Sequence, residues 1–182
     1  MAGSSQDCGS TSPAPRTPDA TLGALVAYVD AETRIAIDGA ACRDDLQSRR
    51  TSVPVDTAMC IAGFAQTLRE DADAIVSAAD THGRSDPACE RSRAQLARSA
   101  RVLSDDWQRV VDDIRGSALA DTWPSAPALR LSIQAAVTQS DLLVAPDLHA
   151  YRKACLVGAE ARSAEDLPER HREANRSAGQ TI

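Results

Sequence analysis

Apolar residues recur along four segments of the chain at steps of three and four positions, which is the spacing of one face of an α-helix. The pattern predicts helices over about 18–49, 56–83, 87–116 and 127–155. The third segment is the most regular, with a heptad-like series of Cys89, Leu96, Ala100, Leu103, Trp107, Val110 and Ile114. Proline at 146 predicts a kink late in the fourth helix.

Four helices of similar length joined by short connections predict an all-α fold, an up-down-up-down antiparallel four-helix bundle. The bundle is expected over residues 18–162. Residues 1–17 are rich in Ser, Gly, Thr and Pro, a composition typical of a flexible tether. Residues 163–182 are polar and lack sustained periodicity, so we expect a frayed C-terminal tail.

Four of the five cysteines are placed symmetrically about two predicted turns. Cys42 and Cys60 each lie nine residues from Thr51, and Cys89 and Cys155 lie about 33 residues on either side of the second turn. Equal distance from the turn of an antiparallel hairpin means equal height, so we expect disulfides Cys42–Cys60 and Cys89–Cys155. Structural disulfides persist in oxidising compartments, which predicts an extracytoplasmic protein, either periplasmic, bound to the cell envelope or secreted. The alternative is that the thiols are free and buried.

The fifth cysteine, Cys8, precedes Gly9, Ser10 and the Ser/Thr/Pro-rich segment. This short region resembles the first residues of a mature bacterial lipoprotein, in which the thiol carries the lipid and the tether reaches to the folded domain. The resemblance implies a lipid tether at the membrane surface. The chain departs from that pattern because Ser5, Gln6 and Asp7 stand where the family has small apolar residues. An unmodified thiol is the alternative.

Composition narrows the function classes further. Hydrophobic residues make up 43% and charged residues 25%, as in globular domains. The net charge of −6 and the 3% of aromatic residues argue against a nucleic-acid partner. No apolar run reaches the 18 residues that a transmembrane helix needs.

We find no pattern of reactive groups and expect neither a cofactor nor a metal site. The three histidines, His82, His149 and His171, have no spacing that would bring metal ligands together, so structural or surface roles are favoured. Arg93 falls on the apolar seam of the third helix and Arg43 sits similarly on the first. A buried guanidinium needs a carboxylate partner or an anionic ligand, so both are possible anion-binding residues unless their heads reach solvent at the end of the bundle.

We therefore expect a binding module of the inhibitor, adaptor or sensor type that recognises a protein partner without catalysis. One alternative is a small secreted all-helical enzyme or binder for a small anionic ligand, similar to secreted chorismate mutase. The basic set of that family does not map onto this chain, because Arg34 has no lysine at a suitable later position. A second alternative is a cytosolic helical regulator with free thiols.

Overall fold

The computed structural model describes residues 19–81, 86–120 and 122–179, and within these ranges every regular element is a helix. The elements are α1 (Ala20–Asp38), α2 (Ala40–Ser48), α3 (Val55–Asp80), α4 (Pro87–Leu119), α5 (Ala126–Leu142), a π-helical turn η1 (Leu143–Asp147), α6 (Leu148–Cys155), α7 (Ala159–Ser163) and α8 (Leu167–Gly179). The prediction of an all-α fold is confirmed.

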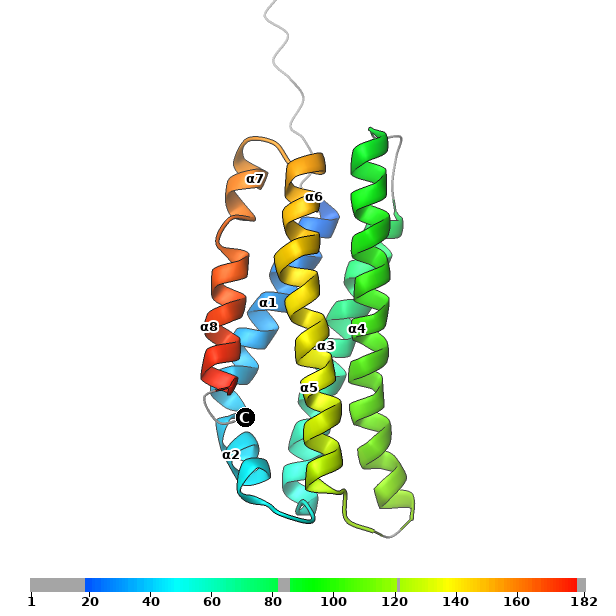
Figure 1. Ribbon diagram of the computed structural model, residues 1–182, viewed down its shortest axis with the longest axis vertical. Helices are drawn as coiled ribbons and strands as arrows, with labels where there is room; N and C mark the ends of the chain where they lie inside the picture. The colour runs from blue at the N-terminus through cyan, green and yellow to red at the C-terminus, as the bar shows by residue number, and fades with distance from the viewer. Residues whose placement is uncertain (1–18, 82–85, 121, 180–182) are drawn as a thin grey trace, which may run out of the picture.

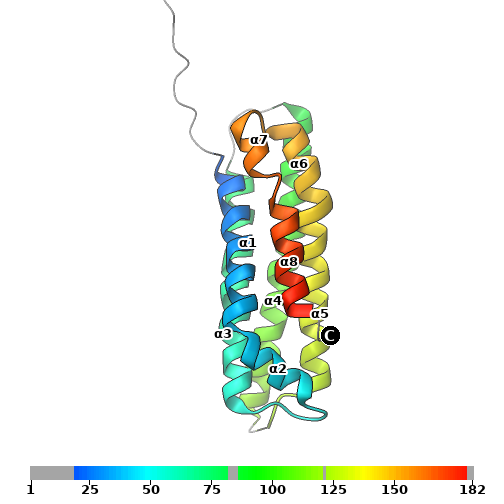
Figure 2. The same ribbon diagram turned by 90° about the vertical axis from the view of Figure 1, so that its left-hand side faces the viewer.

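The long helices run side by side along the longest axis of the molecule (Figure 1). The most extensive interface joins α3 to α4, and α1 also packs on α3 while α5 and α6 pack on α4. Seen from the side, α8 lies beside α1 and covers one flank of the molecule (Figure 2). Two loops, 49–54 and 122–125, meet at one end, where Val53 N donates to Pro124 O and Ala126 N donates to Thr51 O. We call this region the loop end.

The core is built mainly from aliphatic side chains on the inner faces of these helices. Leu25 of α1, Ile75 of α3 and Leu103 of α4 are all fully buried. Tyr28, Trp107 and Tyr151 are the large aromatic members, and the Trp107 indole N–H donates to the Tyr28 hydroxyl at 3.3 Å. This bond satisfies a polar group that would be costly to bury alone.

The single helix expected over 18–49 is wrong, because Gly39 divides it into α1 and α2. A Cβ atom at residue 39 would lie 2.7 Å from both the Ile35 carbonyl oxygen and the Phe64 ring. The missing side chain therefore lets Phe64 of α3 pack directly against the chain where α1 ends. The spacing of apolar residues continues past Gly39 because α2 is also a helix, so the sequence did not reveal the break.

The irregularity predicted at Pro146 is present as the π-helical turn η1 between α5 and α6. Proline has no N–H to donate to the preceding turn, and its ring crowds the carbonyl four residues earlier. A wider turn accommodates both effects, so the helical path continues from α5 to the cysteine that ends α6.

The expected frayed tail over 163–182 is wrong for most of its length. Residues 167–179 form α8, in which Leu167 and His171 are fully buried and Ala174 nearly so. The spacing of these residues places them on one helix face. The predicted tether 1–17 with Cys8, and the predicted end of the second helix at 82–83, lie outside the described residues.

Candidate functional site

Both predicted disulfides are present. Cys42 of α2 is bonded to Cys60 of α3, and Cys89 of α4 is bonded to Cys155 of α6. The bonds span 18 and 66 residues of sequence, respectively. Each one ties neighbouring helical segments at matched heights, as the positions of the cysteines about the turns predicted.

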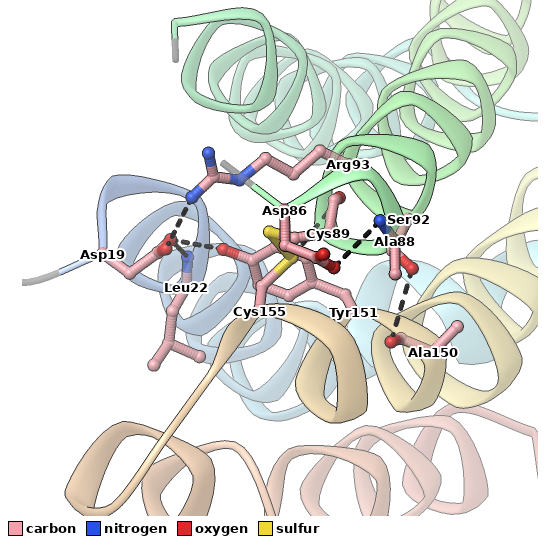
Figure 3. The surroundings of a disulfide bond; sticks show 10 residues. All are labelled: Asp19, Leu22, Asp86, Ala88, Cys89, Ser92, Arg93, Ala150, Tyr151 and Cys155. Carbon is pink, nitrogen blue, oxygen red and sulfur yellow. Dashed lines mark hydrogen bonds and ion pairs between the residues drawn. A yellow bond between two sulfur atoms is a disulfide. The ribbon is translucent and has the colours of Figure 1, made fainter. Parts of the chain in front are cut away.

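The predicted anion-binding residue Arg93 lies beside the Cys89–Cys155 disulfide, where its guanidinium reaches Asp19 (Figure 3). Arg93 Nη2 is 3.2 Å from Asp19 Oδ2, and the Tyr151 hydroxyl donates to Asp19 Oδ1 at 2.5 Å. Asp19 also caps α1 by accepting from Leu22 N. Burial opposes the charge on Asp19, but the bonds from Tyr151 and Leu22 and the charge of Arg93 lower the pKa of Asp19 on balance. The positive charge of Arg93 is therefore neutralised within the chain.

The other predicted anion-binding residue, Arg43, lines a pocket of about 120 Å³ between α2, α3, α4 and α5. Apolar side chains make up most of its wall, with the Arg43 and Arg130 side chains and Gln47 as the polar members. The lining residues are Gly39, Cys42, Arg43, Leu46, Gln47, Ile61, Phe64, Ala65, Trp107, Arg130, Ile133 and Val137. The pocket is thus an apolar recess with cationic residues on its wall.

The two arginines differ in how they are held. Arg130 Nη1 donates to the carbonyl oxygens of Leu46 and Arg49, both at 2.9 Å, and so caps the C-terminal end of α2. Arg43 Nη1 donates to Ala36 O at 3.3 Å, while Arg43 Nε is buried without a hydrogen-bond partner among the described residues. The carboxylate of Asp44 lies 3.6 Å from that nitrogen, beyond hydrogen-bond distance, and is largely exposed.

We compared the chain with known protein families, curated proteins and solved structures. None of them matches it. Its function is therefore inferred from the geometry of the described residues.

A buried polar cluster near the pocket was not predicted from the sequence. His171 of α8 is 1% exposed, and its Nδ1 lies 2.6 Å from Glu32 Oε2 of α1. Its Nε2 lies 2.8 Å from Asp141 Oδ1 of α5. The Ser140 hydroxyl donates to the other oxygen of Glu32 at 2.6 Å. These contacts join three helices that are far apart in the sequence.

The electrostatics of this cluster fix the charge state of His171. Burial alone would lower its pKa, but hydrogen bonds and charges from Glu32 and Asp141 outweigh burial and raise the pKa above the ordinary value. An imidazole with a carboxylate oxygen at each nitrogen is best satisfied as imidazolium, which donates to both. Burial, with a smaller contribution from the charge of Glu32, raises the pKa of Tyr28 as well. Tyr28 therefore stays neutral and accepts from Trp107, which links the cluster to the pocket wall.

This cluster holds α8 against α1 and α5. A general base needs a free nitrogen lone pair, and both ring nitrogens of His171 face carboxylates. The Ser140 side chain is fully buried, so a substrate cannot reach its hydroxyl. Within the described ranges, no group of three or more His, Cys, Asp or Glu residues is arranged to hold a metal ion. None of the described helices is both long and apolar enough to cross a membrane.

Proposed function

We propose that the chain is an extracytoplasmic binding module that recognises a protein partner through its loop end, without catalysis. Its framework, in this proposal, is an up-down-up-down antiparallel four-helix bundle made of α1–α2, α3, α4 and α5–α6, with α8 docked on one flank. Short connections and the two disulfides, each between neighbouring segments, support this arrangement. The disulfides also support an oxidising location such as the periplasm, the cell envelope or the extracellular space.

The observation that carries the proposal is the concentration of exposed apolar side chains towards the loop end. Trp123 lies in a loop there, Val55 begins α3 and Leu119 ends α4. The exposed large apolar residues on or within a few helical turns of this end are Ile37, Val55, Met59, Leu119, Trp123 and Leu131. Leu119 is 90% exposed. Exposed apolar side chains gathered at one end of a protein are typical of an interaction site.

Backbone hydrogen bonds and a disulfide also hold the segments of the loop end together. The backbone bonds between loops 49–54 and 122–125 fix the two loops against each other. The Cys42–Cys60 disulfide ties α2 to α3 just above them. A surface that is already ordered loses little conformational entropy when a partner binds. The partner that fits is a protein with an apolar recognition segment.

Site-directed photo-crosslinking in the native host tests this proposal. A crosslinking residue at 119 or 123 is expected to give one discrete adduct, while the same residue at the exposed Val102, midway along α4, gives none. The adduct partner is then purified and titrated with the chain. Leu119→Ser and Trp123→Ser should each weaken binding at least tenfold, and Val102→Ser should not. Equal adducts from all three positions, or equal affinities of the three variants, would refute recognition by the loop end.

One observation favours the second candidate, a binder of a small anionic ligand. The pocket beside Arg43 has an apolar wall, and two arginines but no acidic residue line it. The two candidates use different residues and are compatible in one molecule.

A further inference from the structure

We infer that the pocket beside Arg43 is a binding site for a small aromatic carboxylate, with the ring held among apolar side chains and the carboxylate bound by Arg43. The pocket is lined by none of the exposed residues named for the loop-end surface, so the inference does not depend on the protein partner.

The wall of the pocket suits a flat apolar group. Phe64 and Trp107 contribute aromatic rings, and Ile61, Ile133 and Val137 contribute branched aliphatic chains. Ligand pockets of this kind take most of their affinity from apolar contact and their specificity from a few polar groups. The volume of about 120 Å³ is close to that of an engineered apolar cavity of about 150 Å³ that binds benzene. One six-membered ring is therefore the size of group that the pocket holds.

The polar side of the pocket suits an anion. Arg43 and Arg130 both line it, and no Asp or Glu is among the lining residues. A carboxylate matches the planar guanidinium better than a neutral acceptor does, because the hydrogen bonds are charge-assisted.

The charges around Arg43 do not already satisfy it. Asp44 is 64% exposed at its side chain and approaches Nε only to 3.6 Å, where water screens the interaction. Asp45 is engaged elsewhere, since its carboxylate accepts from Arg49 and from the Thr57 hydroxyl. Arg130 adds a second positive charge on the same wall, although its Nη1 is used on the carbonyls that end α2.

The walls of the pocket are fixed before any ligand arrives. Cys42, itself a lining residue, is bonded to Cys60. Gly39 allows Phe64 to approach the chain closely, and the Trp107 indole is held by its bond to Tyr28. A preformed pocket avoids the ordering cost that a flexible one would carry.

Calorimetric titration of the oxidised full chain with benzoate and phenylacetate tests the inference. At least one of these probes should bind saturably with a Kd of about 1 mM or tighter. Benzyl alcohol, which has a similar shape and no charge, should bind at least tenfold more weakly than benzoate or phenylacetate. Arg43→Gln should remove this preference, and Arg34→Gln, a change at an exposed arginine of α1, should leave it intact.

Each outcome has a distinct meaning. If both carboxylates fail to saturate the protein, there is no ligand site, and the inference is wrong. If benzyl alcohol binds as well as the carboxylates, the pocket is merely apolar, and the anion site is wrong. If R43Q does not fold, two other results test the inference. The wild-type chain should prefer the carboxylates to the alcohol, and Val137→Phe, which fills the recess, should lose carboxylate binding. None of these results bears on the loop-end partner.

Discussion

Removing the Cys89–Cys155 disulfide should destabilise the protein more than removing the Cys42–Cys60 disulfide, because it closes the longer loop. The sequence separations are 66 and 18 residues. In the chain-entropy treatment, closing these loops raises the free energy of the unfolded chain by about 4.3 and about 3.2 kcal/mol, respectively, at 25 °C. C89A/C155A should therefore lose about 1 kcal/mol more of the free energy of unfolding than C42A/C60A.

Urea denaturation followed by circular dichroism, without reductant, measures both losses. The Cys8→Ser variant is the control. If four of the five cysteines are paired, as the structure has them, replacing the fifth should leave stability unchanged. The m-value should rise in both disulfide variants, since an uncrosslinked unfolded chain exposes more surface. A loss below about 1 kcal/mol for C89A/C155A, or a larger loss for the shorter loop, would refute the assignment of stabilisation to loop closure.

Three further changes test the buried cluster and the α1–α2 junction. His171→Ala should cost about 3–5 kcal/mol of unfolding free energy, since it leaves the buried carboxylate of Glu32 unpaired; urea denaturation measures this, and a loss under about 1 kcal/mol would contradict it. The pKa of His171 is raised in the folded protein, so protonation of His171 stabilises the fold. This stabilisation is complete below the ordinary pKa of histidine and is lost as the pH rises through the raised pKa. The urea midpoint of the wild type should therefore decrease as the pH rises from neutral to alkaline. The decrease that His171 causes should be absent in H171A. Gly39→Ala should lower the melting temperature, because its Cβ would meet Phe64 and a backbone oxygen at 2.7 Å, whereas Gly63→Ala in α3 meets open space and should be neutral or stabilising. Equal melting temperatures for these two variants would count against the tight packing at Gly39.

The helices and the disulfides could be predicted from the sequence because both depend on local spacing. Apolar steps of three and four mark a helix face, and equal distances from a turn set equal heights for the cysteine pairs. Helix α8 was missed because its buried face consists of little more than Leu167, His171 and Ala174 in a strongly polar segment. The spacing of these three residues was the available signal.

The buried cluster could not be predicted in this way. His171 meets Glu32 across 139 residues and Asp141 across 30, and no local pattern encodes such pairings. Arg43 and Arg93 looked equivalent by position, yet Asp19 neutralises one while the other lines a pocket. The difference comes from where α1 begins and from the close approach of Phe64 at Gly39, and both are properties of the packed chain.

Counting thiols in the protein taken from its native compartment tests the central claim most directly, since the preformed pocket and the proposed extracytoplasmic location both depend on oxidised cysteines. The chain is denatured without reductant, alkylated and weighed by mass spectrometry. With two disulfides and five cysteines, at most one alkylated residue, at Cys8, is expected. Five alkylated cysteines would contradict the account and favour a cytosolic helical regulator.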